Sequence, residues 1–206
     1  MARSFNLADL FELVAEAIPE REALTCGARR ESYADLDERA TRLADAFDTE
    51  FGVGPGDHVG LDLYNCCEYV EAMLACWKLR AVPINVNYRY VAAELSPLFE
   101  NADLVGVVCD SLTEREARGA AGDRWVVHTG AQYEELLSAG SPRRVFAERS
   151  GDDHYILYTG GTTGMPRGVV WRHEDIFFTA LGSGNPGGPP ITKPEEIGRA
   201  SCRERV

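Results

Sequence analysis

Short apolar segments alternate with longer amphipathic segments along most of this chain, and this alternation constrains the fold more than any other feature. Strands are predicted at residues 58–64, 82–86, 104–109, 124–128 and 155–158. Apolar side chains at helical spacing predict helices between them, at residues 92–101, 112–118 and 132–138 and in a segment after Asn65. Apolar strands separated by helices are typical of a parallel sheet covered on both faces. The sequence therefore predicts an α/β fold, a Rossmann-like or flavodoxin-like parallel sheet with flanking helices.

Two more helices are predicted before the first of these strands. Asn6 is suited to cap the first helix, whose apolar positions are Leu7, Leu10, Phe11, Val14 and Ile18. The second helix follows Tyr33 and ends at the glycine-rich turn of residues 52–57. Asn65 is expected to cap the helix that follows the first strand, because Glu68 stands three residues later in the register of a capping box.

The composition argues against several classes of protein. The 206 residues carry a net charge of −12 and no basic patch, which argues against nucleic acid as a partner. No apolar run exceeds six residues, so no transmembrane segment is predicted. The acidic residues Asp9, Glu12 and Glu16 make the N-terminus unlike a signal peptide, and a cytoplasmic location is expected. The six cysteines form no C-x-x-C pair, and we assign them neither a metal site nor a function.

Residues 158–168, YTGGTTGMPRG, form a loop with four glycines and three threonines after the last predicted strand. The spacing does not match the P-loop or the dinucleotide-binding fingerprint, since a required glycine is missing in each case. The G-x-S-x-G elbow of hydrolases is also absent. A helix is expected directly beyond the loop, over residues 171–181. The loop is therefore either a plain turn between a strand and a helix or an anion-binding loop of another kind.

The residue types in the loop favour a phosphate ligand. Glycines at 160, 161 and 164 allow the backbone to bring its N–H groups close to an anion. Threonines add hydroxyl donors, and Arg167 offers a planar charged group suited to phosphate oxygens. The loop also follows a strand of a parallel sheet, where such folds bind ligands. The candidate ligand-binding residues are Thr159, Gly160, Gly161, Thr162, Thr163, Gly164 and Arg167.

Residues 155–175, YILYTGGTTGMPRGVVWRHED, resemble the signature loop of adenylate-forming enzymes, [YF]-T-[SG]-G-[ST]-T-G-x-P-K-G-V. The resemblance extends upstream through residues 30–47, 52–90 and 98–108 and is greatest to bacterial acyl-CoA ligases for fatty acids or steroid side-chain acids. It implies the N-terminal part of the large domain of such an enzyme. It also implies that a small-molecule carboxylic acid is activated with ATP and Mg²⁺ to an acyl-adenylate and then transferred to coenzyme A.

Two departures from the family pattern limit what the resemblance implies. Arg167 stands where the family usually has lysine. The family's adenine-binding, magnesium-binding and ribose-binding residues, and its catalytic lysine, lie downstream of the signature loop. Nothing before Glu196 corresponds to them, so we name no catalytic residue and no metal ligand and expect this chain to be inactive alone. The alternative is a stand-alone phosphate- or nucleotide-binding module without ligase activity.

The last ten residues, IGRASCRERV, differ in character from the rest of the chain. They carry three arginines and one glutamate and have no apolar periodicity. A back-translation of this segment resembles a common sequencing adapter. Our hypothesis is that residues 1–196 are the native portion and residues 197–206 a non-native tail, and the alternative is a natural basic tail.

Three features outside the loop have structural interpretations. His173 is expected to cap or pack at the start of a helix, and Asp152 and Asp153 to lie in a solvated turn. The tryptophans are expected in the core: Trp77, Trp125 and Trp171. The tyrosines of VNYRY, residues 86–90, are candidates to line the mouth of a substrate site.

Overall fold

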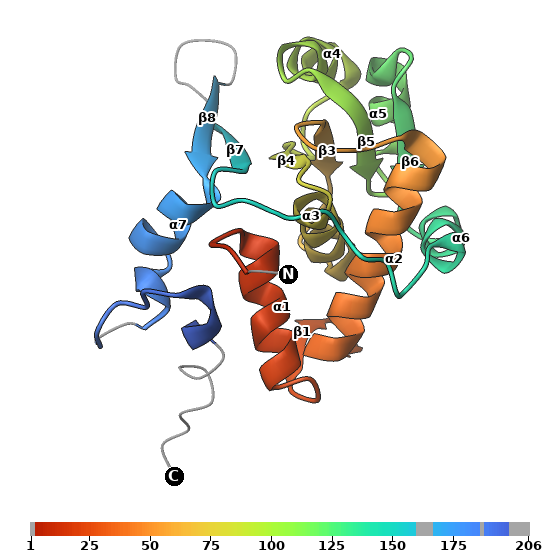
Figure 1. Ribbon diagram of the computed structural model, residues 1–206. Helices are drawn as coiled ribbons and strands as arrows, with labels where there is room; N and C mark the ends of the chain where they lie inside the picture. The colour runs from red at the N-terminus through yellow and green to blue at the C-terminus, as the bar shows by residue number, and fades with distance from the viewer. Residues whose placement is uncertain (1–2, 160–166, 186–187, 198–206) are drawn as a thin grey trace.

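The computed structural model describes residues 3–159, 167–185 and 188–197, and its centre is a six-stranded sheet (Figure 1). The strands lie in the order β6-β5-β3-β4-β7-β8. Their bounds are β3 His58–Asp62, β4 Val82–Asn85, β5 Leu104–Cys109, β6 Trp125–His128, β7 His154–Thr159 and β8 Arg167–Arg172. Neighbouring strands are parallel except β7 and β8. A mostly parallel sheet with flanking helices confirms the predicted fold class.

Helices cover both faces of the sheet. On one face lie α2 (Tyr33–Phe51), α3 (Cys67–Lys78) and α6 (Ala131–Ala139), which share a buried cluster with Leu61 of β3. On the other face lie α4 (Ala92–Asn101) and α5 (Glu114–Ala121), which share a second cluster with Ile84 of β4. Burial of apolar side chains on both faces explains why these strands are apolar throughout.

A third cluster joins the N-terminal helix to the C-terminal part of the described chain. It contains Leu10 of α1 (Leu7–Ala17), Trp77 of α3 and Phe177 of α7 (His173–Thr179). Asn6 caps α1 as predicted, because its side chain accepts a hydrogen bond from the Ala8 N–H at 2.8 Å. The turns η1 (Gly182–Gly184) and η2 (Pro194–Glu196) follow α7.

A small antiparallel hairpin was not predicted from the sequence. It consists of β1 (Glu22–Cys26) and β2 (Arg29–Ser32) and joins α1 to α2. Most of its side chains are polar and at least partly exposed, so they lack the continuous apolar pattern that identified the strands of the main sheet.

The cap predicted at Asn65 is wrong. Helix α3 begins at Cys67, its N-cap residue is Cys66, and no side chain makes the capping hydrogen bond. The carbonyl of Asn65 instead accepts from the Cys26 thiol at 3.8 Å. The chain between β3 and α3 is therefore shaped by tertiary contacts as well as by local capping.

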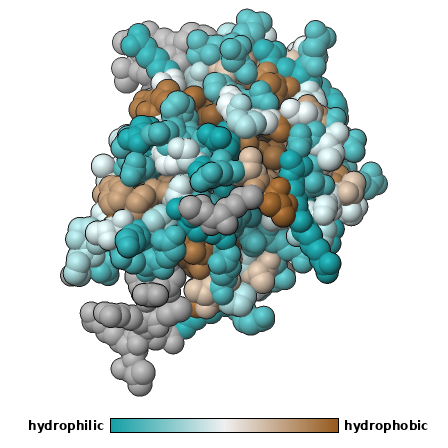
Figure 2. All heavy atoms as spheres, viewed as in Figure 1, coloured by the Kyte–Doolittle hydropathy of each residue, from teal (hydrophilic) through white to brown (hydrophobic). Residues whose placement is uncertain are grey.

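The helix predicted over residues 171–181 is also wrong in its first two and last two residues, since α7 spans only His173–Thr179. The chain continues as β8, antiparallel to β7, and α7 begins only at His173. Valines and an aromatic residue favour this strand, and β8 lies at the edge of the sheet, where Trp171 is 38% exposed. Trp171 is therefore not a core residue. The side chains of Val169 and Val170 on β8 are also exposed. Figure 2, in the same orientation as Figure 1, shows apolar area on the surface at the upper left, where β8 lies.

None of the described helices is long and apolar enough to span a membrane.

Candidate functional site

Strands β7 and β8 place two of the predicted ligand-binding residues side by side. Thr159 is the last residue of β7, Arg167 is the first of β8, and the two are register partners. Both are exposed, so the hydroxyl and the guanidinium are available to a ligand. The remaining predicted ligand-binding residues lie outside the described part of the chain: Gly160, Gly161, Thr162, Thr163 and Gly164.

A pocket of about 340 Å³ lies next to this pair, at the carboxyl ends of β3, β4 and β7. We call it the strand-end pocket. Asn65 follows β3, Asn87 follows β4, and Tyr158 precedes Thr159 on β7. The full lining is Leu63, Asn65, Tyr69, Asn85, Val86, Asn87, Tyr88, Tyr90, Leu98 and Tyr158. Both tyrosines of the predicted VNYRY segment, Tyr88 and Tyr90, thus line a pocket, together with Val86 and Asn87 of the same segment.

The topology of the sheet explains the location of this pocket. Strand β4 lies on one side of β3, and the chain reaches it from β3 through α3. Strand β5 lies on the other side of β3, and the chain reaches it from β4 through α4. The two helices therefore leave neighbouring strand ends toward opposite faces of the sheet. Such a reversal of strand order leaves a crevice at the carboxyl ends of the strands, which is where open α/β sheets bind ligands.

The pocket is lined by neutral polar and aromatic groups. No carboxylate or cationic side chain is among its lining residues. Burial raises the pKa of Tyr69 to about 12, so its phenol stays protonated at neutral pH. At the mouth, the rings of Tyr64 and Tyr88 have centroids 4.2 Å apart, and the Arg89 guanidinium lies 5.5 Å from the Tyr88 ring. This arrangement provides flat contact surfaces and hydrogen-bonding groups without excess negative charge.

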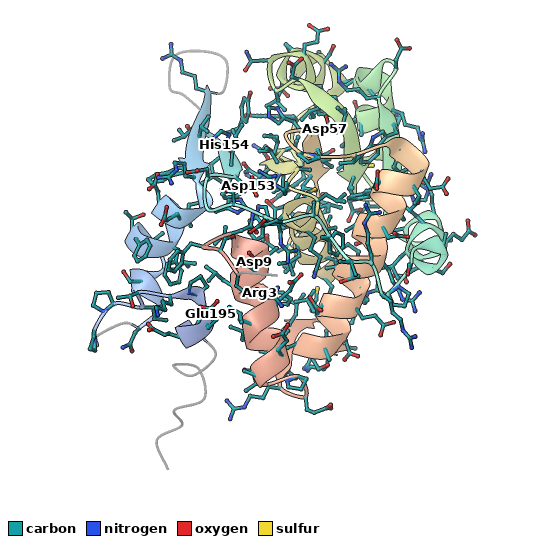
Figure 3. The ribbon with its side chains drawn as sticks, in the orientation of Figure 1. Arg3, Asp9, Asp57, Asp153, His154 and Glu195 are labelled. Atoms are coloured by element: carbon teal, nitrogen blue, oxygen red, sulfur yellow. The ribbon has the colours of Figure 1, made fainter. Side chains whose placement is uncertain are left out.

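The base of the β7–β8 hairpin is anchored to the body of the protein by Asp153, which directly precedes β7 (Figure 3). Its carboxylate accepts from Arg80 at 2.8 Å and 3.0 Å and from the Asn6 amide at 2.9 Å. Asp153 is only partly exposed, so the prediction that it lies in a solvated turn is wrong; its neighbour Asp152 is exposed, as predicted. The carboxylate links the hairpin to α1 and to the turn before β4.

His173 anchors the other strand of the hairpin. The residue is fully buried, its Nδ1 accepts from the Leu7 N–H at 3.1 Å, and its Nε2 lies 3.2 Å from the His154 carbonyl. Burial lowers the pKa of His173 to about 4, although nearby Asp153 acts in the opposite direction. His173 is therefore a neutral packing residue at a helix start, as the sequence predicted.

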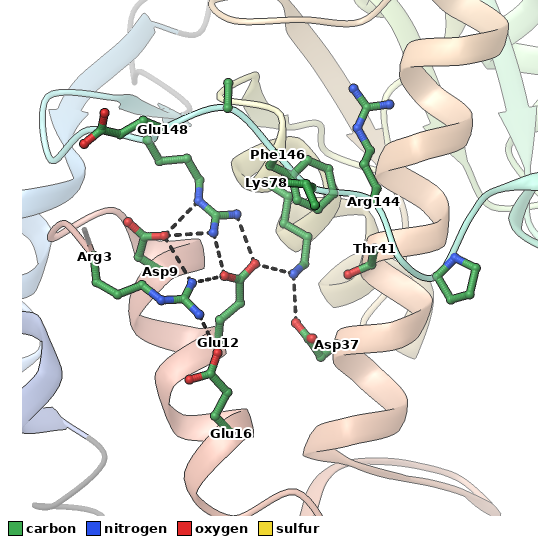
Figure 4. A pocket seen from close by; sticks show the side chains of 14 residues that line it. Arg3, Asp9, Glu12, Glu16, Asp37, Thr41, Lys78, Arg144, Phe146 and Glu148 are labelled. Carbon is green, nitrogen blue, oxygen red and sulfur yellow. Dashed lines mark hydrogen bonds and ion pairs between the residues drawn. The ribbon is translucent and has the colours of Figure 1, made fainter. Parts of the chain in front are cut away.

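A larger cavity of about 620 Å³ lies away from the strand ends (Figure 4). We call it the charged cavity. It is lined by Arg3, Asp9, Glu12, Glu16, Asp37, Thr41, Lys78, Pro142, Arg144, Val145, Phe146, Ala147, Glu148 and Arg149. The Lys78 ammonium, which is 2% exposed, lies 2.6 Å from Glu12 and 2.8 Å from Asp37. Arg149 bonds the same Glu12 at 2.5 Å. Because these charges already have partners, we assign this cavity a structural role.

Mg²⁺ and ATP are implied by the predicted chemistry. The described residues contain no group of three acidic, histidine or cysteine side chains able to hold a metal ion. The exposed Thr159–Arg167 pair does fit phosphate oxygens, because it combines a hydroxyl donor with a fixed positive charge.

The residues of the strand-end pocket outside VNYRY were not predicted as site residues. Asn65 was interpreted as a helix cap, and Asn85, Tyr69 and Leu98 were interpreted as parts of strands or helices. A usable signal was present, since Asn65 and Asn85 lie at the ends of two strands that are adjacent in the sheet.

Comparison with known proteins agrees with the fold. The model of the AMP-binding enzyme family matches residues 11–192. The 3-oxocholest-4-en-26-oate–CoA ligase of Rhodococcus rhodochrous is 44% identical over 197 residues, covering 88% of this chain and 35% of the relative. A medium/long-chain-fatty-acid–CoA/3-oxocholest-4-en-26-oate–CoA ligase of Mycobacterium marinum is 43% identical, covering 88% of this chain and 36% of the relative.

A solved structure of an acyl-CoA ligase has the same fold. The crystal structure of a long-chain-fatty-acid–CoA ligase from Archaeoglobus fulgidus superposes with a TM-score of 0.78 at 25% identity, covering 88% of this chain and 39% of that one. This chain thus spans about a third of the length of the relatives it matches. The matched family model and the identity to these acyl-CoA ligases lead to one conclusion: the chain belongs to the AMP-binding enzyme family.

Proposed function

We propose that this chain supplies the phosphate-binding hairpin and part of the substrate pocket of an ATP-dependent acyl-CoA ligase. The observation that carries the proposal is the exposed Thr159–Arg167 pair beside the strand-end pocket. Relatives named as ligases for fatty acids or a steroid side-chain acid make such acids the proposed substrates. The proposed phosphate contacts come from Thr159 to Gly164 and Arg167.

The proposed reaction has two steps. A carboxylate oxygen of the acid attacks the α-phosphorus of ATP, and the bond to the bridging oxygen of pyrophosphate breaks, giving an acyl-adenylate. The thiol of coenzyme A then attacks the acyl carbon, AMP leaves, and the thiol proton is released. Both partners of the first step are anions, so positioning and charge neutralisation lower its barrier. Bound Mg²⁺ would supply further neutralisation of the phosphates.

Within this scheme, Arg167 stabilises the charge on the departing pyrophosphate. The guanidinium keeps the charge of the family's usual lysine but presents a planar group with several donors. The strand-end pocket contributes neutral walls that do not repel an anionic substrate. We assign no proton transfer to any residue of this chain.

A chimeric enzyme tests this proposal. Residues 1–192 of this chain would replace the matching N-terminal portion of the Rhodococcus rhodochrous ligase, and formation of acyl-CoA would be measured with the relative's acid. The proposal predicts thioester formation by the chimera and none by the 206-residue chain alone. A folded chimera that forms no thioester, together with ATP binding by a monomeric 206-residue chain, would instead support a stand-alone binding module.

A further inference from the structure

Strands β4 and β7 separate just below the strand-end pocket. They share a single register pair, Ile84 with Ile156, whereas β7 and β8 share six. Beyond that pair, the backbone N–H of Tyr158 donates to the side-chain oxygen of Asn85 at 3.2 Å. A side-chain amide therefore takes the place of a backbone acceptor, and the two strands diverge without leaving this N–H unpaired. Both residues line the pocket that the divergence opens.

The side chain of Tyr158 makes a second link, to the helix on the same face. Its hydroxyl donates to the side-chain oxygen of Asn101, the last residue of α4, at 3.0 Å. Burial raises the pKa of Tyr158, so the phenol keeps its proton and remains a donor at neutral pH. Tyr158 is thus bonded through its backbone to β4 and through its side chain to α4.

The ring of Tyr158 also packs on the partner strand. Its register partner is Gly168, and a Cβ at that position would lie 3.0 Å from Tyr158 Cε2 and 3.2 Å from Cζ. A glycine therefore lets the ring lie against the backbone of β8, an arrangement known to stabilise glycines in sheets. Gly168 directly follows Arg167, and Tyr158 directly precedes Thr159.

We propose that Tyr158, held by Asn85 and Asn101 and packed on Gly168, is a positioning residue that fixes where Thr159 and Arg167 lie relative to the strand-end pocket. It acts through its neighbours on β7 and β8 and makes no reacting contact of its own. The assignment of pyrophosphate as the ligand rests on the proposed function, whereas the positioning itself does not.

The experiment compares variants of the 206-residue chain. Tyr158→Phe and Asn101→Leu each remove the same hydrogen bond, and Asn101→Asp keeps an acceptor at that position. Tyr155→Phe is the matched control, because it removes a hydroxyl from the same strand but on the opposite face, where Tyr155 packs against Trp77. Two quantities are measured, the exchange rates of the Thr159 and Arg167 amide hydrogens and the affinity for inorganic pyrophosphate.

Tyr158→Phe and Asn101→Leu are expected to speed exchange at both amides and to weaken pyrophosphate binding by about three- to ten-fold, the range for losing one hydrogen bond. The double variant should match either single one, since both remove the same bond. Asn101→Asp should restore wild-type values, and Tyr155→Phe should leave both quantities unchanged.

Unchanged exchange in Tyr158→Phe, or an Asn101→Asp variant that behaves like Asn101→Leu, would overturn the proposal. If the wild-type chain has no affinity for pyrophosphate, phosphate binding by this hairpin fails as a function of the chain. The exchange rates at Thr159 and Arg167 then still decide the positioning role, because they need no ligand.

Discussion

The charged cavity is larger than the strand-end pocket, about 620 Å³ against about 340 Å³, yet its ionic groups are bonded to one another. In the charged cavity, Lys78 and Arg149 share Glu12, and the Phe146 ring lies 5.6 Å from the Lys78 ammonium. In the strand-end pocket, the lining groups are neutral amides, phenols and apolar side chains. The larger volume of the charged cavity therefore does not by itself make it the better candidate binding site.

The two cavities also differ in what they connect. The charged cavity links α1, α2 and α3 to the segment of residues 142–149 that leads toward β7. The strand-end pocket lies at the reversal of strand order. It is next to Thr159 and Arg167, the predicted ligand-binding residues that the structure describes. Changes in the charged cavity should therefore alter stability, and changes around the strand-end pocket should alter ligand binding.

The largest effect is expected from Glu12→Leu. Losing this carboxylate leaves the nearly buried Lys78 and Arg149 with fewer partners, and removal of one member of a buried ion pair destabilises proteins by about 3–5 kcal/mol. Urea unfolding should show this loss, while pyrophosphate affinity of the folded chain should stay within two-fold, roughly the scatter of distant sites. Glu16→Gln, at a more exposed position of the same helix, is the control. A stability equal to wild type would contradict a structural role for the charged cavity.

Lowering the pH should weaken the ion pairs that Glu12 makes with Lys78 and Arg149. Burial raises the pKa of Glu12, but Lys78 and Arg149 outweigh this and lower it to about 2. A lowered carboxyl pKa contributes stability above its unfolded value of 4.5 that is lost as the pH falls toward 2. The free energy of unfolding should drop by roughly 3 kcal/mol from this group, with a smaller drop in Glu12→Gln. An equal drop in both proteins would contradict the assignment.

Arg167→Ala should lower pyrophosphate affinity and leave stability nearly unchanged, the reverse of the pattern expected for Glu12→Leu. We expect about a ten-fold loss of pyrophosphate affinity, the size of a lost charge-assisted hydrogen bond, and little change in stability because the residue is exposed. Arg172→Ala, at the other end of β8, removes the same charge and should leave affinity unchanged. Arg167→Lys should retain most of the affinity. Equal losses of pyrophosphate affinity in Arg167→Ala and Arg172→Ala would indicate a nonspecific charge effect.

The smallest effect is expected from Tyr88→Ala at the mouth of the strand-end pocket. Its ring contacts Tyr64 and Arg89, and loss of one aromatic contact costs about 0.5–1.5 kcal/mol. In the chimeric ligase, this should raise the KM for ATP, the acid or coenzyme A a few-fold, and the substrate affected identifies the occupant. Tyr88→Phe should behave as wild type. Three unchanged KM values would exclude the pocket from the site.

Much of the fold could be predicted because strands buried on both faces have an unmistakable composition. The predicted bounds of 92–101 and 104–109 are those of α4 and β5. The edge elements were missed for the same physical reason. Strand β8 is exposed, and the β1–β2 hairpin is mostly polar, so neither has the pattern of a covered strand.

The candidate site was predictable only where it depends on local sequence. Thr159 and Arg167 were predicted from the composition of one loop. The hydrogen bonds that hold Tyr158 beside them were not, because the Asn85–Tyr158–Asn101 arrangement joins residues far apart in the chain through strand order and helix placement. Asp153 was misinterpreted for the same reason, since its partners Arg80 and Asn6 are distant in sequence.

Exchange of pyrophosphate into ATP by the chimeric ligase, measured with and without the carboxylic acid substrate, decides whether the Thr159–Arg167 pair serves adenylation, because this exchange reports the adenylation step alone. We expect exchange that requires the carboxylic acid, that falls at least ten-fold on Arg167→Glu as a charge contact reverses, and that is unchanged on Arg172→Glu. A folded chimera without exchange, or one whose exchange is insensitive to Arg167→Glu, would contradict this expectation.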